Sequence, residues 1–318
     1  MLGISGSPRE GGNTDALLTS FLDEAKSAGA RTQKIVPARM EIRPCVECRR
    51  CEQEGVCWIE DDMQEVYRLL READVIAAAS PIFFYGTTAW LKGLIDRTQC
   101  LWARQHVMKL VDPGARSRIG VFLSVGATKG ERLFDGATMT LRYFFEAVGA
   151  RFSGSLVYRR IEHPGDIERH PTALSDARAL ARQVVGPFLA RKRVLYLCRE
   201  NAARSQMAHA FTRYRAGDRI EAISAGDNPA ETVNPDMVSV MAELGIDMAF
   251  VQPKPVSEVL GARDPDLVVT MGCMDACPVL PGVKVIDWAL ADPAGKGIEA
   301  MRETRDEIAR RVDDLIGP

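Results

Sequence analysis

The stretch that decides the fold is Val194-Leu195-Tyr196-Leu197-Cys198-Arg199-Glu200-Asn201-Ala202-Ala203-Arg204-Ser205. Its four leading apolar residues predict a buried strand, and the residues from Gln206 onward have the pattern of a helix. A strand, a tight loop and a helix N-terminus form an anion site, because backbone N–H groups and the positive end of the helix dipole face one point. Arg204 adds a planar guanidinium for a tetrahedral oxyanion. Cys198 is therefore predicted to be a nucleophile that faces a bound oxyanion; the alternative is a buried, inert cysteine at a strand end.

Length and composition restrict the class of protein. The 318 residues suffice for two domains, and 46% hydrophobic with 26% charged residues is typical of soluble globular proteins. A net charge of −2 gives no basic field for nucleic acid or an acidic membrane surface. No apolar run reaches the roughly 18 residues of a membrane span, and the N-terminus lacks a secretion signal. We expect a cytoplasmic protein whose eight cysteines serve redox or metal chemistry.

The first half opens with a Gly/Ser-rich loop between a short apolar stretch and a helical pattern, at 5–14. Such a loop suits a phosphate, although an ordinary polar turn explains it equally well on its own. Buried strands predicted over 74–79 and 120–124 also end in loops, and ligands of open α/β sheets lie at such strand ends. The candidate residues of this site are Ser5, Ser7, Arg9, Asn13, Thr14, Pro81, Ile82, Phe83, Phe84, Tyr85, Gly86, Ser124 and Gly126.

Three motifs carry a family resemblance for this half: Gly-Ser-Pro-Arg-x-x-Gly-Asn-Thr at 6–14, Ser-Pro-Ile-Phe-Phe-Tyr-Gly at 80–86 and Leu-Lys-Gly-Leu-Ile-Asp-Arg at 91–97. Over about residues 1–190 the chain resembles the NADPH-dependent FMN reductase and iron-sulfur flavoprotein family. The resemblance implies a flavodoxin-like sheet, bound FMN, electrons from NAD(P)H or a ferredoxin-type donor, and a homo-oligomer.

Four cysteines lie between these loops, in the spacing Cys45-x2-Cys48-x2-Cys51-x5-Cys57. Thiolates this closely spaced can hold a [4Fe–4S] cluster, while zinc or free thiols are the alternatives. The spacing matches the compact motif of the iron-sulfur flavoproteins, which favours the cluster. Cys100 stands apart from them and is predicted to be a packing residue.

In the second half, strands are predicted over 220–226, 267–271 and 283–286, and a final helix over 298–315. Cys273 and Cys277 follow the end of a predicted strand. A redox reaction at this site would need such thiols, whereas a phosphatase would not. The alternative is that the pair binds a metal or occurs by chance. Asp292 before Pro293 is a carboxylate able to protonate a leaving oxygen, or a simple turn residue.

The segments Cys-x2-Asn-x2-Arg-Ser-Gln-Met-Ala at 198–208, Thr-Met-Gly-Cys-Met-Asp-Ala-Cys-Pro at 270–278 and Asp-Trp-x3-Asp-Pro-Ala-Gly at 287–295 resemble a thioredoxin-coupled arsenate reductase. That enzyme lies within the low-molecular-weight protein tyrosine phosphatase superfamily, and the resemblance covers about residues 193–318. It implies arsenate as substrate, with the catalytic residues Cys198, Arg204, Ser205, Cys273, Cys277 and Asp292. The oxyanion loop would be Arg199, Glu200, Asn201, Ala202 and Ala203, in which the carboxylate of Glu200 departs from an anion-binding pattern unless it points outward.

We therefore expect two doubly wound parallel-sheet α/β domains, flavodoxin-like over 1–190 and low-molecular-weight phosphatase-like over 193–318, joined by a few residues. The leading hypothesis is a bifunctional enzyme in which electrons from NAD(P)H pass through FMN to a Cys198/Cys273/Cys277 relay that reduces arsenate to arsenite. The alternatives are two separate activities, with thioredoxin serving the second domain, and a tyrosine phosphatase fused to an independent FMN reductase.

Overall fold

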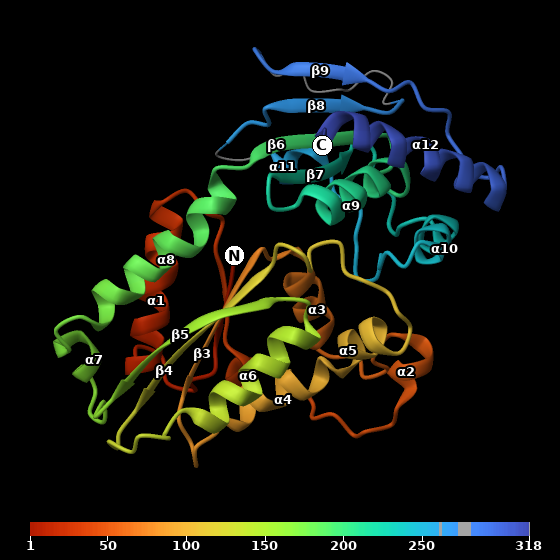
Figure 1. Ribbon diagram of the computed structural model, residues 1–318. Helices are drawn as coiled ribbons and strands as arrows, with labels where there is room; N and C mark the ends of the chain where they lie inside the picture. Colours follow the sequence, from red (N-terminus) through yellow and green to blue (C-terminus); the bar gives the residue numbers. More distant parts are fainter. Residues whose placement is uncertain (261–262, 273–280, 318) are drawn as a thin grey trace. The chain divides into compact units, whose positions relative to one another are not determined.

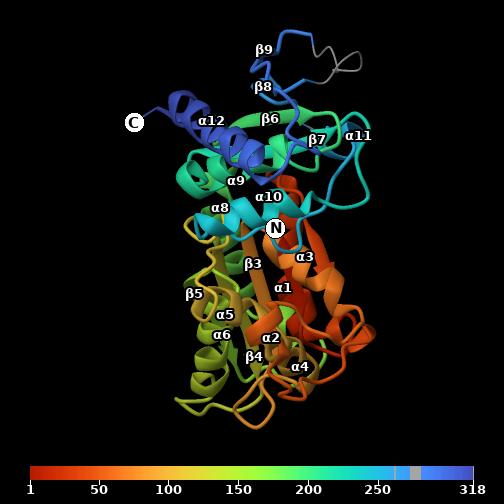
Figure 2. The ribbon, with the colours of Figure 1, turned by 90° about the vertical axis from the view of Figure 1, so that its right-hand side faces the viewer.

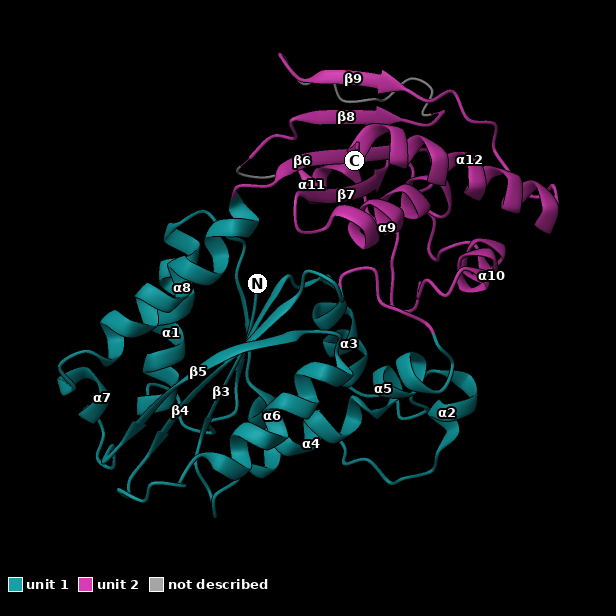
Figure 3. Ribbon diagram, viewed as in Figure 1, with its two compact units in different colours: residues 1–109, 115–189 teal, residues 110–114, 190–318 magenta. Residues whose placement is uncertain are grey.

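The computed structural model describes residues 1–260, 263–272 and 281–317. These residues form two compact units, of which unit 1 comprises residues 1–109 and 115–189 and unit 2 comprises residues 110–114 and 190–318 (Figure 3). Each unit is built on its own parallel sheet, so the predicted fold class of two parallel-sheet α/β domains is confirmed. Within the described ranges, no helix combines the length and the apolar character needed to cross a bilayer.

The sheet of unit 1 has the strand order β2-β1-β3-β4-β5 and is parallel throughout, which is the doubly wound order of flavodoxin. Its strands are β1 (Leu2–Ser5), β2 (Gln33–Ile35), β3 (Val75–Pro81), β4 (Ile119–Gly126) and β5 (Arg151–Arg159). Its helices are α1 (Asn13–Ser27), the short 3-10 helix η1 (Pro37–Arg39), α2 (Arg50–Glu54), α3 (Met63–Glu72), α4 (Ala89–Arg97), α5 (Gln99–His106), α6 (Asp135–Ala147), α7 (Asp166–Arg169) and α8 (Ala173–Leu189).

Helices cover both faces of this sheet, which is why β3 and β4 are apolar along almost their whole length. On one face α1 packs beside α8, and Leu17, Phe21 and Val184 join the side chains of Ala77 and Val121 in a single buried cluster. Figures 1 and 2 show α3, α4 and α6 on the opposite face. The central strands are thus fixed from both sides, and the loops at their carboxyl ends start from rigid positions.

The sheet of unit 2 has the order β7-β6-β8-β9 and is also parallel. Its strands are β6 (Lys192–Cys198), β7 (Ile220–Gly226), β8 (Leu267–Thr270) and β9 (Lys284–Asp287), and its helices are α9 (Arg204–Ala216), α10 (Pro235–Glu243), α11 (Val256–Val259) and α12 (Ile298–Ile316). Tyr196, Phe211 and Ile308 belong to the core between the sheet and helices α9, α10 and α12. The other face of the sheet buries Leu195 and Leu197 with Val259 of α11.

Strand pairing decides which loops of unit 2 meet. β6 lies between β7 and β8, with Cys198 opposite Gly226 and Leu197 opposite Thr270. The N–H of Met271 continues the β8 pairing by donating to the carbonyl oxygen of Leu197 at 2.8 Å. Because parallel strands end at the same edge, the loops after β6, β7 and β8 share one side of the unit.

Candidate functional site

In the loop from β6 to α9, residues 199–203, hydrogen bonds from a neighbouring segment hold the carbonyl groups away from the space beside Cys198. Three of its carbonyl oxygens accept backbone hydrogen bonds of 2.9–3.0 Å from one neighbouring segment: Arg199, Glu200 and Ala202 accept from Asn228, Ala230 and Asn234. No described side chain caps the N-terminus of α9 that follows. The loop and the first turn of the helix therefore keep N–H groups for an anion.

A chain of hydrogen bonds places a donor against the sulfur of Cys198. Oδ1 of Asn201 accepts from the backbone N–H of Lys254 at 2.9 Å and from Nε2 of Gln206 at 3.0 Å. This fixes the amide, so that Nδ2 donates to Oγ of Ser205 at 2.7 Å. Oγ of Ser205 lies 3.0 Å from Sγ of Cys198, where either atom can donate to the other, so the hydroxyl is within reach to donate to a thiolate.

Asn201 occupies an unusual backbone position for this purpose. Its φ is +49°, in the left-handed region that asparagine tolerates better than most residues, and its side chain is fully buried. Gly226, opposite the loop, lacks a Cβ that would otherwise lie 2.6 Å from the carbonyl oxygen of Arg199. Both residues therefore let the loop close tightly over the end of β6.

Arg204 joins the oxyanion loop to the loop after β9. Its guanidinium is buried and donates from Nη2 to Oδ2 of Asp292 at 2.8 Å and from Nη1 to the carbonyl oxygen of Leu290 at 3.0 Å. Gly272 lies against the same group, since a Cβ there would be 3.0 Å from Nη1 of Arg204. Cys273, the next residue in the chain, and Cys277 lie outside the described residues. The described residue that lies against Arg204, Gly272, is thus the direct neighbour of the first predicted relay cysteine.

The two charged residues of the loop do not enter the anion site. Arg199 and Glu200 are exposed, whereas Asn201 and Ala202 are buried. The carboxylate of Glu200, which departs from an anion-binding pattern in the sequence, is therefore a solvent-facing side chain.

In unit 1, Asp15 organises the loop after β1, and the sequence analysis did not single it out. Its carboxylate accepts from Oγ of Ser5 at 3.0 Å and from the N–H of Gly11 at 3.1 Å, and pairs with Lys34 at 2.6 Å. Burial alone would raise the pKa of Asp15, but the hydrogen bonds from Lys34, Gly11 and Ser5 outweigh it and hold that pKa below its usual value. The feature of the sequence that could have indicated this role is an acidic residue in the first turn of a predicted helix.

Thr88 ties together the loops that follow β1 and β3. Its Oγ1 donates to the carbonyl oxygen of Gly6 at 2.6 Å, and its N–H donates to Oγ of Ser80 at 3.2 Å. Ser124, at the end of β4, donates to the carbonyl oxygen of Ser80 at 2.6 Å. The structure thus brings the three predicted loops to one edge of the sheet, and Thr88 is a second residue that the sequence analysis missed.

The aromatic loop after β3 is a two-residue hairpin with its apolar tip exposed. Phe83 and Gly86 exchange backbone hydrogen bonds of 3.0 and 2.9 Å, while Phe84 and Tyr85 between them have φ values of +49° and +63°. Left-handed backbone at aromatic residues is strained and is retained where surrounding contacts determine it. Here the N–H of Ala137 in α6 binds the carbonyl oxygen of Tyr85 at 3.1 Å, so the loop presents flat apolar surface from a fixed position.

Asn13 is engaged away from the other predicted phosphate donors. Its amide donates to the carbonyl oxygen of His163 at 2.9 Å and accepts from the N–H of Ile167 at 3.2 Å. Ser7 binds the backbone of Arg9 in a local turn, and the Arg9 side chain is exposed. No described side chain caps the 15-residue helix α1 at Gly12, so the first backbone N–H groups of α1 are available to an anion.

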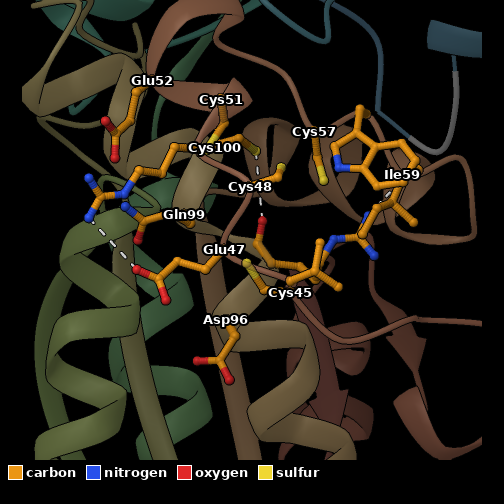
Figure 4. Close-up of a pocket in the computed structure, with 14 residues that line it drawn as sticks. Cys45, Glu47, Cys48, Cys51, Glu52, Cys57, Ile59, Asp96, Gln99 and Cys100 are labelled. Atoms are coloured by element: carbon orange, nitrogen blue, oxygen red, sulfur yellow. Dashed lines mark hydrogen bonds and ion pairs between the residues drawn. The ribbon is translucent and has the colours of Figure 1, made fainter.

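The four closely spaced cysteines line one cavity of about 450 Å³ (Figure 4). The described cysteines of the chain are free thiols. Burial raises the pKa of Cys51, and the neighbouring Cys57, Cys45 and Cys48 raise it further, so the four thiols are close enough to repel one another as anions. Within the described part of the chain, no group of three or more such side chains converges as a metal site.

Cys100 contributes a fifth sulfur to this cavity, which its isolated place in the sequence did not reveal. It is 1% exposed, and burial raises its pKa to about 12. Cys100 therefore stays protonated at neutral pH.

Two family models match the chain, one in its N-terminal and one in its C-terminal part. The NADPH-dependent FMN reductase model matches residues 1–157, and the low molecular weight phosphotyrosine protein phosphatase model matches residues 193–317.

Curated relatives fall into the same two groups. An iron-sulfur flavoprotein of Methanocaldococcus jannaschii is 32% identical over 197 residues, covering 58% of this chain and 94% of the relative. A glutaredoxin arsenate reductase of Synechocystis sp. is 34% identical over 128 residues, covering 39% of this chain and 96% of the relative. Arsenate reductase 2 of Staphylococcus epidermidis is 35% identical over 129 residues, with coverages of 39% and 96%.

Replacing Asn201 by alanine should destabilise unit 2 by about 3 kcal/mol, because three buried hydrogen bonds and a favourable left-handed residue are lost. Asn201→Gly should recover about 1 kcal/mol of this loss by restoring the backbone freedom. Hydrogen exchange of the β6 amides in a urea series reports the free energy of unfolding for this unit. The control is Asn234→Ala, which removes the cap of α10 and should cost about 1 kcal/mol. If Asn201→Ala lowers the free energy of unfolding by no more than this control does, Asn201 does not hold the loop in the way described.

Replacing Asp292 by asparagine should tighten the binding of inorganic phosphate about two- to fivefold, because the oxyanion no longer competes with a carboxylate for Arg204. Isothermal titration calorimetry measures this dissociation constant without turnover. The matched control is Asp313→Asn, since Asp313 also pairs with an arginine, Arg215, at 2.8 Å and has a similarly exposed side chain, 59% against 53% for Asp292. Phosphate binding that is unchanged or weaker in Asp292→Asn contradicts the competition.

Proposed function

The chain belongs to two families, joining a domain of the NADPH-dependent FMN reductase family to one of the low molecular weight phosphotyrosine protein phosphatase family, and we propose that it reduces arsenate to arsenite. The observation that carries this proposal is the loop after β6, in which Sγ of Cys198 lies 3.0 Å from the hydroxyl of Ser205 and the buried Arg204 opens the following helix. The arsenate reductase relatives support arsenate as the oxyanion.

In the first step the thiolate of Cys198 attacks arsenic, forms an S–As bond and displaces an oxygen as water. Backbone N–H groups of the loop and the guanidinium of Arg204 hold the remaining oxygens. We assign the protonation of the departing oxygen to Asp292, and its contact with Arg204 at 2.8 Å supports this assignment. Arsenic remains As(V) in this adduct.

In the second step another thiolate attacks the sulfur of Cys198, and the S–As bond breaks. Its electron pair stays on arsenic, which leaves as arsenite, As(III), while the two sulfurs become a disulfide. We assign this attack to Cys273 and the transfer of the disulfide to Cys277. The position of Gly272 against Arg204 supports the assignment, because Cys273 is its neighbour in the chain.

Unit 1 has the residues to hold FMN, the cofactor that its family name implies. The uncapped N-terminus of α1 suits the phosphate, and the exposed aromatic tip at 83–85 suits a flat ring. Bound flavin supplies hydride acceptance from NAD(P)H and electron release in one- or two-electron steps. The four thiols at 45–57 have the number and chemistry that a [4Fe–4S] cluster needs and line one cavity, but in the described structure they do not converge as a ligand group, so they would have to close around the cluster. A bound cluster would supply one-electron transfer.

We further propose that unit 1 provides the reducing equivalents that the oxidised cysteine pair of unit 2 needs. The covalent linkage supports this, because α8 ends at Leu189 and β6 begins at Lys192. The cysteines must start each cycle as thiols, so the reducing cytoplasm is the fitting compartment. An external thiol reductant such as thioredoxin or glutaredoxin is the competing source of electrons.

Arsenite formation from arsenate and NADPH, with no added thioredoxin, tests this function in the intact, flavin-loaded chain. Cys198→Ser should lower the rate about a thousandfold or more, and Cys273→Ser and Cys277→Ser should each abolish sustained turnover, because every sulfur is needed once per cycle. Ser239→Ala, an exposed hydroxyl on α10 outside both proposed sites, is the control and should retain turnover.

Hydrolysis of an aryl phosphate by the same variants separates reductase from phosphatase. Wild-type protein that cleaves the aryl phosphate in a Cys198-dependent way but forms no arsenite under any reductant is a phosphatase, and the proposal is wrong. Arsenite formation that strictly requires added thioredoxin contradicts the role of unit 1 as electron source and leaves the arsenate chemistry intact.

A further inference from the structure

Arg97, the last residue of α4, holds both ends of the segment that carries the four cysteines. Its Nη1 donates to the carbonyl oxygen of Arg43 at 2.8 Å, and its Nη2 donates to that of Ile59 at 3.1 Å. The same two nitrogens bind the carboxylate of Asp61 at 2.6 and 3.1 Å. The guanidinium thus anchors the chain two residues before Cys45 and two residues after Cys57.

One donor of this guanidinium is left over. Four of its five N–H groups are used by these contacts, while Nε is buried and has no hydrogen-bond partner among the described residues. Arg97 is 1% exposed, so water does not compensate for the missing partner, and a buried orphan donor is rare in folded proteins. The residue also lines the cavity of the cysteines.

The positive charge of Arg97 is opposite in sign to the thiolate-bound cluster that the cavity would hold. Burial alone would lower the pKa of Arg97, but the hydrogen bond to Asp61 outweighs it, so the net shift is upward and the group stays cationic; Cys57 also raises this pKa. The other charged side chains that line the cavity are more exposed: Asp96 is 44%, Glu47 85% and Arg49 70% exposed, and Glu52 is half-buried. The charge of Arg97 is offset by its buried partner Asp61 at 2.6 Å, so what Arg97 offers the cavity is a buried N–H donor on a guanidinium held in place.

We propose that Arg97 is the positioning residue of the cysteine cavity, and that its Nε–H donates to a sulfur of the iron-sulfur group which the four thiolates hold. This inference rests on the proposed cluster. A cationic donor against a thiolate-bound cluster stabilises the electron-rich state more than the oxidised one, because the reduced cluster carries one more negative charge. Arg97 therefore raises the reduction potential of the cluster, besides anchoring the segment.

The direct test is pulsed electron paramagnetic resonance of the full chain, reconstituted anaerobically with iron and sulfide, reduced with dithionite and labelled with ¹⁵N at arginine Nε. A ¹⁵N hyperfine coupling to the cluster is expected in the wild type, absent from Arg97→Lys and retained in Arg49→Lys. Arg49 is the matched control, since it lines the same cavity but is exposed.

The redox readout uses the same variants at the midpoint potential of the wild-type cluster. The ratio of reduced to oxidised cluster should fall by about threefold or more in Arg97→Lys and stay unchanged in Arg49→Lys. If Arg97→Lys fails to assemble a cluster, the wild-type hyperfine coupling decides alone. A wild-type cluster with no arginine coupling overturns the role of Arg97 and leaves the cluster proposal standing. Reconstituted wild-type protein with no cluster signal overturns both.

Discussion

The anion site of unit 2 depends on where one short loop sends its carbonyl groups. The carbonyl oxygens of Arg199, Glu200 and Ala202 are bound by backbone N–H groups of residues 228–234, which leaves the N–H groups of the loop available beside Cys198. The left-handed backbone of Asn201 makes this turn possible, and its side chain then orients Ser205 toward the sulfur. The proposed nucleophile and the proposed oxyanion donors are therefore held by the fold itself.

Parallel strand order extends this arrangement to the rest of the chain. In both units the strand that precedes the proposed anion loop is an inner strand with a neighbour on each side, so loops distant in sequence meet at one edge. In unit 1, Thr88 ties these loops by two hydrogen bonds, and in unit 2, Arg204 binds the loop after β9. The two domains belong to different families, yet in both the candidate site is formed by loops that meet at one edge of a parallel sheet.

Local pattern was enough to predict several strands, the final helix and the loop between β6 and α9, because each depends on residues that are neighbours in sequence. The strand predicted over 220–226 has those bounds in the structure, and the helix predicted over 298–315 is Ile298–Ile316. The strands β2 and β5 were not predicted. Contacts between distant residues could not be predicted in this way. Asn13 binds residues about 150 positions away, and Arg97 binds the carbonyl oxygen of Arg43 across 54 positions, although nothing in either local sequence indicates the partner. The roles of Cys273 and Cys277 stay predictions, since both lie outside the described residues.

The central claim is that three sulfurs of unit 2 pass one disulfide along after capturing arsenate. A single-turnover experiment tests it most directly: fully reduced protein without NADPH or thioredoxin is mixed with arsenate, quenched by alkylation and mapped by peptide mass spectrometry. The account predicts one arsenite per chain, a disulfide between Cys273 and Cys277, and an alkylated, free Cys198. Three alkylated cysteines after exposure to arsenate, with no arsenite released, would contradict it.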